Sequence, residues 1–305
     1  MIKYKSNLVN AFCVDMEDWF HISGSHNFTD PRRWEVSPES VVKDTEKLLE
    51  IFAKYDVKVT FLVLGWIARK YPSLIKRISD LGHEIGSHGF YHRLVYKMTP
   101  EEFELDVAIS IKLLKDITGK EIRIFRAPSF SITKDCFWTF PILSKLGIKT
   151  DISVVPAKRN QGGIEDFPRD PFILENENGE IQIIPVTVMD ILGKPVQFSG
   201  GGFLRFFPEF LLNQGFNQNH KHERQVMSFI HPREINPYHP RVKSSLVKYL
   251  RLYMGLTTVD RKLNFLFRNY KFSSISKTYN NHSFPRFKMG VDNKLESITS
   301  ESKIL

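Results

Sequence analysis

Cysteine is scarce in this 305-residue chain, and long apolar runs and a leader-like start are missing. The two cysteines, Cys13 and Cys136, lie in apolar stretches, so we expect buried free thiols of a reducing compartment and no disulfide framework. No stretch of about 18 apolar residues occurs, which argues against a membrane-spanning helix. The first residues also lack the apolar core of a signal peptide. These absences predict a cytoplasmic protein with no integral membrane segment.

The balance of charge is moderately basic. Lys and Arg total 43 against 34 Asp and Glu, a net charge of +9, but no long basic run occurs. Such a spread predicts no nucleic-acid partner. Hydrophobic residues make up 42% of the chain, with 25 Phe, which is enough for a sizeable core.

Strand-like and helix-like segments alternate through the first half of the chain. The apolar patterns predict strands over 8–16, 57–64, 83–87, 122–125 and 149–155, separated by helices over 37–56, 68–81, 99–119 and 137–146. This alternation requires a parallel sheet, either open or closed into a barrel.

The second half has a different character. It is rich in Gly and Pro, and it has a late strand over 226–230 and a helix over 244–267. Leu246, Leu250, Tyr253 and Leu256 lie on one face of that helix. Its Lys and Arg residues predict a solvated basic face, with a membrane-surface element as the alternative. From about residue 280 the chain is polar and aperiodic, which indicates a disordered tail.

Polar side chains follow the ends of several predicted strands. They are Asp15, Glu17, Asp18, His88, Arg126, Asp151 and His231. The carboxyl ends of parallel strands gather functional groups at one edge of the sheet. This shared placement predicts an enzyme.

His88 and His92 are spaced to reach one point in space. Two imidazoles and one carboxylate give a divalent metal three protein ligands and leave positions open for water and substrate. Such a metal lowers the pKa of bound water toward about 7 and polarises a carbonyl group. Hydrolysis of an amide or ester also needs a base for the water and an acid for the leaving group.

Four motifs in a fixed order resemble those of the polysaccharide deacetylase family, also known as the nodulation-protein-B homology group or carbohydrate esterase family 4. The motifs are Val14-Asp15-Met16-Glu17-Asp18-Trp19-Phe20, Gly82 to His92, Phe125-Arg126-Ala127-Pro128-Ser129-Phe130, and Phe229-Ile230-His231-Pro232-Arg233-Glu234. The first motif, the last motif and Phe198 to Phe203 are most similar to the branch found in exosortase-linked exopolysaccharide loci. The resemblance covers roughly residues 8–275.

The resemblance implies a role for each matching residue. Asp15 would be the catalytic base, and Arg126 would hold its carboxylate in the ionised form. His231 would be the general acid, oriented by Asp151. His88 and His92 would bind a divalent metal, with Zn²⁺ as the first choice.

The third metal ligand departs from the family pattern. The family has two adjacent aspartates, base and then ligand, whereas Met16 follows Asp15 here. The ligand is therefore Glu17 or Asp18. On a continuing strand Glu17 would share a face with Asp15, but a turn would bring Asp18 round, and we favour Asp18 slightly.

Further residues are candidates for contacts with a sugar. Trp19 and Phe130 could stack on a sugar ring, and the backbone at Gly201 and Gly202 could approach the substrate. Glu234 is interpreted as a local structural partner.

The resemblance implies a distorted (β/α) barrel with fewer than eight complete units. Residues 1–240 would form this catalytic barrel, 241–279 a helical extension packed on it, and 280–305 the tail. The expected reaction is metal-dependent removal of N-acetyl groups from N-acetylhexosamine units of a cell-surface or exopolysaccharide, or its precursor. A cytoplasmic enzyme would meet that glycan at the inner membrane face, as a peripheral protein. Alternatives are deacetylation of peptidoglycan, chitin oligomers or a small cyclic amide, and an inactive carbohydrate-binding module.

Overall fold

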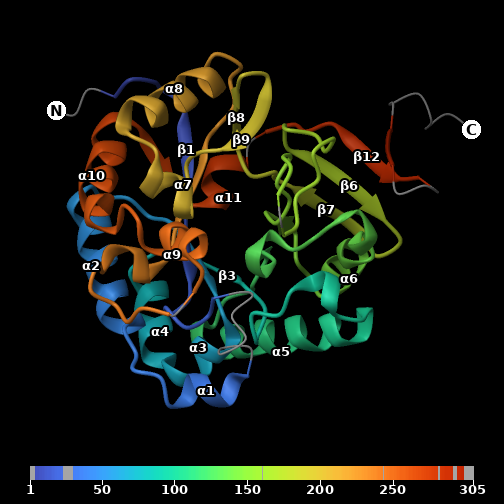
Figure 1. Ribbon diagram of the computed structural model, residues 1–305. Helices are drawn as coiled ribbons and strands as arrows, with labels where there is room; N and C mark the ends of the chain where they lie inside the picture. The colour runs from blue at the N-terminus through green and yellow to red at the C-terminus, as the bar shows by residue number, and fades with distance from the viewer. Residues whose placement is uncertain are drawn as a thin grey trace, which may run out of the picture.

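The computed structural model describes residues 4–22, 30–159, 161–242, 244–280, 282–290 and 294–298. One large sheet organises them (Figure 1). Its strands lie in the order β10 (Met227–Ile230), β1 (Val9–Met16), β2 (Thr60–Val63), β3 (Glu84–Ser87), β4 (Ile124–Phe125), β5 (Thr150–Asp151), β7 (Gly179–Ile183), β6 (Phe172–Asn176), β12 (Arg286–Met289) and β13 (Leu295–Ser297). Pairing is parallel from β10 through β5 to β7, and antiparallel for β6–β7 and β12–β13. In addition, β11 (Lys271–Ser273) pairs with the start of β1, and β8 (Val188–Ile191) and β9 (Lys194–Gln197) form a separate hairpin.

Helices cover the sheet and fill the crossovers between its strands (Figure 1). They are α1 (Pro31–Glu35), α2 (Val41–Lys54), α3 (Gly65–Lys70), α4 (Pro72–Asp80), α5 (Pro100–Thr118), α6 (Thr139–Lys145), α7 (Gly201–Phe206), α8 (Glu209–His220), α9 (Leu246–Tyr253), α10 (Val259–Asn269) and α11 (Ile275–Tyr279). Helix α5 begins and ends where the sequence predicts. Thr99 and Glu102 form a capping box at its start, and Gly119 ends it with a φ of 69°.

The core is built around β1, the strand that carries the first acidic motif. The ring of Phe12 in β1 lies 5.8 Å from Phe52 of α2, 5.1 Å from Phe267 of α10 and 5.6 Å from Phe272 of β11. Burial of a Phe side chain contributes on the order of 1.5–3 kcal/mol. These contacts therefore join the C-terminal helices to the first strand.

The register of the parallel strands aligns their carboxyl ends. Asp15 pairs with Leu62, Val63 with Ser87, Ser87 with Phe125, and Phe125 with Asp151, while Val14 pairs with Ile230 on the other side. The residues that follow these strands consequently start from one edge of the sheet.

The predicted α/β fold on parallel strands is confirmed. Among the described residues no hydrogen bonds join β10 to β13, so the barrel-like sheet does not close. The single helix predicted over 68–81 is two helices, α3 and α4, because Pro72 lacks an N–H and forces non-helical backbone angles on Tyr71. The helix predicted over 244–267 is likewise split, at Gly255 with a φ of 78°.

The prediction of a disordered tail over 280–305 is wrong where the structure describes it. Residues 286–289 form β12, which pairs in parallel with β6, and the ring of Phe287 packs 5.2 Å from Phe172. The polar sequence hides this strand because its charged residues pair with neighbours, as Arg286 does with Glu175 and Glu180. The boundary at residue 240 stays a prediction.

The structure bears on the predictions about cysteine and about membrane-spanning helices. Cys13 and Cys136 are buried and form no disulfide, as predicted. None of the helices in the described ranges has the length and apolar character needed to cross a membrane.

Candidate active site

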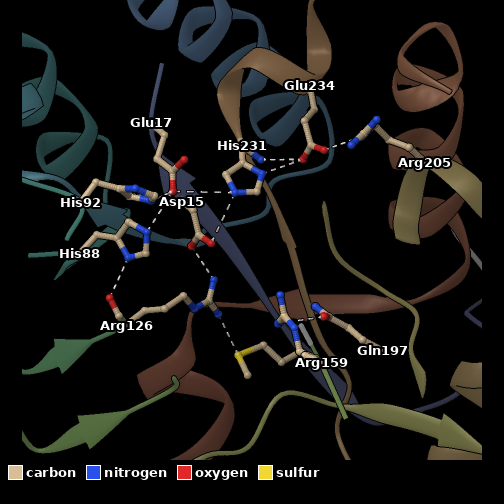
Figure 2. Close-up of polar contacts among 11 residues, drawn as sticks. Asp15, Glu17, His88, His92, Arg126, Arg159, Gln197, Arg205, His231 and Glu234 are labelled. Carbon is tan, nitrogen blue, oxygen red and sulfur yellow. Dashed lines mark hydrogen bonds and ion pairs between the residues drawn. The ribbon is translucent and has the colours of Figure 1, made fainter. Parts of the chain in front are cut away.

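Three potential metal ligands converge at the edge where the parallel strands end (Figure 2). Glu17 Oε1 lies 3.1 Å from His88 Nε2 and 2.8 Å from His92 Nε2. All three ligand atoms lie within 4.8 Å of one another. Glu17 follows β1, and the two histidines follow β3. The His92 backbone has a φ of 52°, an uncommon conformation that must be held by its surroundings.

The tautomer of His88 fits a metal ligand. Its Nδ1 lies 2.7 Å from the carbonyl oxygen of Arg126, which can only accept, so Nδ1 carries the proton. Nε2, the nitrogen that is left to act as a ligand, faces the Glu17 carboxylate at 3.1 Å. Ligating histidines commonly donate their second N–H to a carbonyl in this way.

The spacing and electrostatics of this triad also fit a divalent ion. Zn²⁺ bonds of about 2.0–2.1 Å in a tetrahedron place ligand atoms about 3.3 Å apart, a few tenths of an ångström wider than observed. Burial would raise the pKa of Glu17. Positive charge on His92 and His231 and hydrogen bonds from the histidines instead hold that pKa well below its usual range. The carboxylate is therefore ionised and ready to bind a cation.

Asp18, the ligand that the sequence favoured, lies elsewhere. Its Oδ2 accepts hydrogen bonds from the backbone N–H groups of Ser40, at 2.9 Å, and Val41, at 3.0 Å. Its Oδ1 accepts from the Trp19 N–H, at 2.7 Å, and the Ser40 hydroxyl, at 3.0 Å. Asp18 thus caps the start of α2, where negative charge is favoured, and the preference for it as a ligand is wrong.

Asp15 forms a buried ion pair with Arg126. The Nη1 of Arg126 lies 2.5 Å from Asp15 Oδ1, and both side chains are buried. The guanidinium also contacts the rings of Phe130 and Phe229, with its central carbon 5.2 Å and 5.1 Å from their centroids. Burial would lower the pKa of Arg126, but the charge of Asp15 outweighs it and raises that pKa above its usual value. The pair therefore holds the Asp15 carboxylate in place.

His231 faces both acidic groups. Its Nε2 lies 3.9 Å from Asp15 Oδ2 and 3.9 Å from Glu17 Oε1 (Figure 2). Burial would lower the pKa of His231, but the charges of Glu17 and Glu234 raise it above its usual value. The two carboxylates thus favour the protonated form of His231.

Glu234 and Arg205 hold His231. The sequence indicated Glu234 as a local structural partner, whereas it gave no sign of Arg205. Glu234 Oε2 accepts hydrogen bonds from His231 Nδ1 and from the His231 backbone N–H, each at 3.0 Å. Arg205 Nε donates to Glu234 Oε1 at 2.6 Å, and its other nitrogens donate to the carbonyl oxygens of Met254 and Arg251, each at 2.8 Å. The one available signal was the spacing of three residues between His231 and Glu234, which fits a capping box.

Asp151 does not contact His231, and its predicted orienting role is wrong. Its two carboxylate oxygens accept from the Ser153 N–H, at 3.0 Å, and the Ser153 hydroxyl, at 2.6 Å. Burial raises its pKa to about 7, against the hydrogen bonds from Ser153 and the nearby charge of Arg126. The Ser153 hydroxyl accepts a hydrogen bond from the Ala127 N–H at 2.8 Å, so Asp151 supports the segment next to Arg126 through Ser153.

The predicted sugar-binding residues divide into two groups. Trp19 and Phe130 are buried, with the Trp19 indole donating to the carbonyl of Pro38 at 2.7 Å, so neither presents a face for stacking on a sugar. Gly201 lies beside the site, since a Cβ at this position would come within 3.7 Å of His231 Cε1, and its φ is 51°. Gly202 follows it into α7, where a Cβ would lie 3.7 Å from the Arg251 carbonyl oxygen, so its predicted contact with substrate is untested.

The fold and the site together define a parallel α/β protein with a histidine–histidine–carboxylate cluster beside an acid–base pair. Comparison with known families gives two matches: residues 21–150 match the polysaccharide deacetylase model, and residues 152–280 match a domain of unknown function. Residues 21–150 are thus similar to the polysaccharide deacetylase family. The similarity to the exopolysaccharide branch stays a prediction.

Similar proteins carry names that agree with this family. The peptidoglycan deacetylase of Helicobacter pylori is 33% identical over 109 residues, which is 36% of this chain and 36% of that protein. The peptidoglycan-N-acetylmuramic acid deacetylase PdaA of Bacillus subtilis is 27% identical over 149 residues, which is 48% of this chain and 56% of that protein. The matched regions thus span only about a third to a half of these relatives.

A solved structure supports the fold over more of the chain. A putative polysaccharide deacetylase from Mycobacterium smegmatis superimposes with a TM-score of 0.53 at 17% identity, covering 86% of this chain and 93% of that one. At this identity the likeness shows the fold alone.

The site draws on both matched regions. His88, His92 and Arg126 lie in the polysaccharide deacetylase region, whereas His231 and its partners lie in the domain of unknown function. Asp15 and Glu17 lie before residue 21, outside both matched regions. Strand β10, which His231 follows, pairs with β1, and β1 in turn pairs with β2 of the first region. The two regions consequently form one sheet and one site.

Proposed function

We propose that this chain is a metal-dependent hydrolase that removes N-acetyl groups from N-acetylhexosamine units of a cell-surface or exopolysaccharide, or its precursor, and releases acetate. One observation carries the proposal: a complete set of groups for amide hydrolysis converges at one edge of the sheet. The metal-ligand triad, the Asp15–Arg126 pair and the supported His231 lie within hydrogen-bond or ion-pair distance of one another (Figure 2).

Asp15 is the proposed general base. Its Oδ1 is occupied by Arg126, and Oδ2 faces His231 at 3.9 Å, so Oδ2 is the oxygen placed to take a proton from the attacking water. Arg126 would keep the carboxylate ionised before the step and stabilise the charge of the site afterwards.

His231 is the proposed general acid. Its raised pKa keeps a proton on Nε2, the nitrogen that faces the site, while Nδ1 donates to Glu234. That proton would pass to the departing amine nitrogen when the amide bond breaks. Glu234 would orient the ring and stabilise its cationic form, and Arg205 would hold Glu234.

Glu17, His88 and His92 would hold the metal ion, for which we propose Zn²⁺. When bound, such an ion polarises the acetyl carbonyl and lowers the pKa of water. The remaining steps are assigned to Asp15 and His231.

The domain of unknown function has a specific part in this proposal. It would complete the catalytic machinery by supplying the general acid and its support, and it would extend the sheet beyond β5. Neither matched region would then be active alone.

Peptidoglycan is the second candidate substrate, because the similar proteins named above are peptidoglycan deacetylases. An inactive carbohydrate-binding module would not need an acid, a base and three converging ligands held by buried partners. That set favours an enzyme.

Substitution of His88 by Ala tests the proposal. The purified variant should lose both bound zinc, measured by elemental analysis, and acetate release from N-acetylglucosamine polymers or from peptidoglycan. His222→Ala, which removes an exposed histidine, is the matched control and should retain both. Full acetate release by His88→Ala would refute the mechanism, and a rate on peptidoglycan far above that on other polymers would transfer the proposal to the second substrate.

A further inference from the structure

Helix α9 turns an apolar stripe toward solvent. Leu246, Leu250 and Met254 follow one another at intervals of four residues and are all exposed, as is Val247 beside them. Leu246 is the most exposed of the four, at 73%. The helix buries Tyr253 instead. An ordinary surface helix has the opposite orientation, with its apolar stripe on the core.

Helices α7 and α8 also expose apolar side chains. Phe203 and Phe206 of α7 are exposed, and Phe210 of α8 is 68% exposed. Helix α7 lies against the end of α9, because Arg205 donates hydrogen bonds to the carbonyl oxygens of Arg251 and Met254 (Figure 1). We call the seven side chains the α7–α9 apolar surface: Phe203, Phe206, Phe210, Leu246, Val247, Leu250 and Met254. Clustered exposed apolar side chains of this kind mark interaction sites.

The segment around α9 carries charge of one sign. Residues 235–259 contain no Asp or Glu, and they contain Arg241, Lys243, Lys248 and Arg251. Arg251 lies one turn after Val247 on α9 and is exposed, as is Arg241. Apolar side chains ringed by basic ones are complementary to the surface of a membrane with anionic lipids, which attracts both.

Helix α7 borders the candidate active site. Gly201, at the start of α7, lies beside His231, and Arg205 in the middle of α7 holds Glu234. A membrane or protein bound to the α7–α9 apolar surface would therefore lie close to His231 and the candidate active site.

We propose that the α7–α9 apolar surface docks on an anionic lipid bilayer. Apolar side chains would enter the interface between headgroups and acyl chains, and Arg241 and Arg251 would meet lipid phosphates. A second copy of this chain is a poorer occupant, because a symmetric contact would bring two basic, acid-free segments together. Docking would place the site at the membrane surface, where a lipid-linked or nascent glycan would be met. The proposal concerns location, and its test needs no catalytic activity.

Co-sedimentation of the full chain with vesicles tests the proposal. Vesicles of phosphatidylcholine mixed with an equal share of phosphatidylglycerol should retain the protein, and pure phosphatidylcholine should retain much less. The double variant Leu246→Glu, Leu250→Glu should bind the anionic vesicles on the order of tenfold more weakly or worse. Arg241→Gln combined with Arg251→Gln should weaken binding and reduce its dependence on salt.

A matched control is available on another face. Leu105 and Ile109 of α5 are also exposed and four residues apart, so Leu105→Glu with Ile109→Glu makes the same chemical change away from the proposed surface. That variant should bind vesicles like the unchanged protein, and thermal unfolding would confirm that both double variants are folded. No binding to anionic vesicles, or equal loss in both double variants, would overturn the proposal. Self-association that only the α9 variant abolishes, without vesicle binding, would overturn it in favour of a second copy.

Discussion

Replacement of Glu234 by Gln should slow catalysis and change its pH dependence. The substitution keeps the shape of the side chain but removes the negative charge next to His231 Nδ1, 3.0 Å away. The pKa of His231 is raised because the charges of Glu17 and Glu234 outweigh burial. With one of those charges gone, the pKa of His231 falls and the acid loses its proton at a lower pH. The alkaline limb of the pH–rate profile should therefore move to lower pH.

The size of the loss follows from the contact that is weakened. A hydrogen bond to a charged group contributes about 1.5–3 kcal/mol net. If this amount is lost from the transition state, kcat should fall by roughly 10- to 150-fold near neutral pH. The loss should be larger above neutral pH than below it, because at low pH His231 stays protonated in both proteins.

Acetate release measured across the pH range, with zinc content measured in parallel, distinguishes this role from a structural one. Bound zinc should be unchanged in Glu234→Gln, because Glu234 is not a ligand. Glu209→Gln is the matched control, since it weakens a surface contact between a carboxylate and Arg261 and should leave the profile unchanged.

Two results would refute the reasoning. One is a Glu234→Gln enzyme with normal kcat and an unmoved alkaline limb. The other is the same shift produced by Asp151→Asn, which would return the orienting role to Asp151.

Two further predictions concern the other carboxylates. Glu17→Gln should lose bound zinc, whereas Asp18→Asn should keep it. Asp18→Asn should lower the free energy of unfolding by about 1.5–3 kcal/mol, because both oxygens of Asp18 accept hydrogen bonds and an amide nitrogen cannot. Elemental analysis and urea denaturation measure the two effects, and zinc loss only in Asp18→Asn would reverse the ligand assignment. Burial raises the pKa of Asp151 to about 7, so ionisation costs the folded protein stability as the pH rises from its unfolded-state value, near 4, through 7. Asp151→Asn removes that cost, and its stability relative to the unchanged protein should be higher at about pH 8 than at about pH 5; a difference independent of pH would contradict this.

The candidate site was predictable where a residue follows a parallel strand. Asp15, His88, Arg126 and His231 each come at such a strand end, and the register of the sheet aligns those ends. The apolar strand pattern and the polar residue after it are both local features. Their convergence then follows from the geometry of a parallel sheet.

The partners of these residues were not predictable, because they depend on the direction of side chains after the strand ends. A turn after β1, with the Glu17 N–H bonded to the Asp15 carbonyl oxygen at 2.9 Å, sends Glu17 to the histidines and Asp18 to the start of α2. Adjacent acids in the sequence thus have unrelated functions. Arg205 precedes Glu234 by 29 residues and reaches it only because α7 packs beside β10.

The sequence by itself determined the strand–helix alternation, the acids and histidines at the strand ends, and the family resemblance that orders them. These are properties of short segments, governed by apolar periodicity and capping residues. The tertiary structure alone decided that Glu17 joins the histidines, that Glu234 and not Asp151 holds His231, and that α9 shows its leucines to solvent. Each of these depends on which distant segments of the chain pack together. The residue type sets the chemistry of a side chain, whereas packing sets its partner.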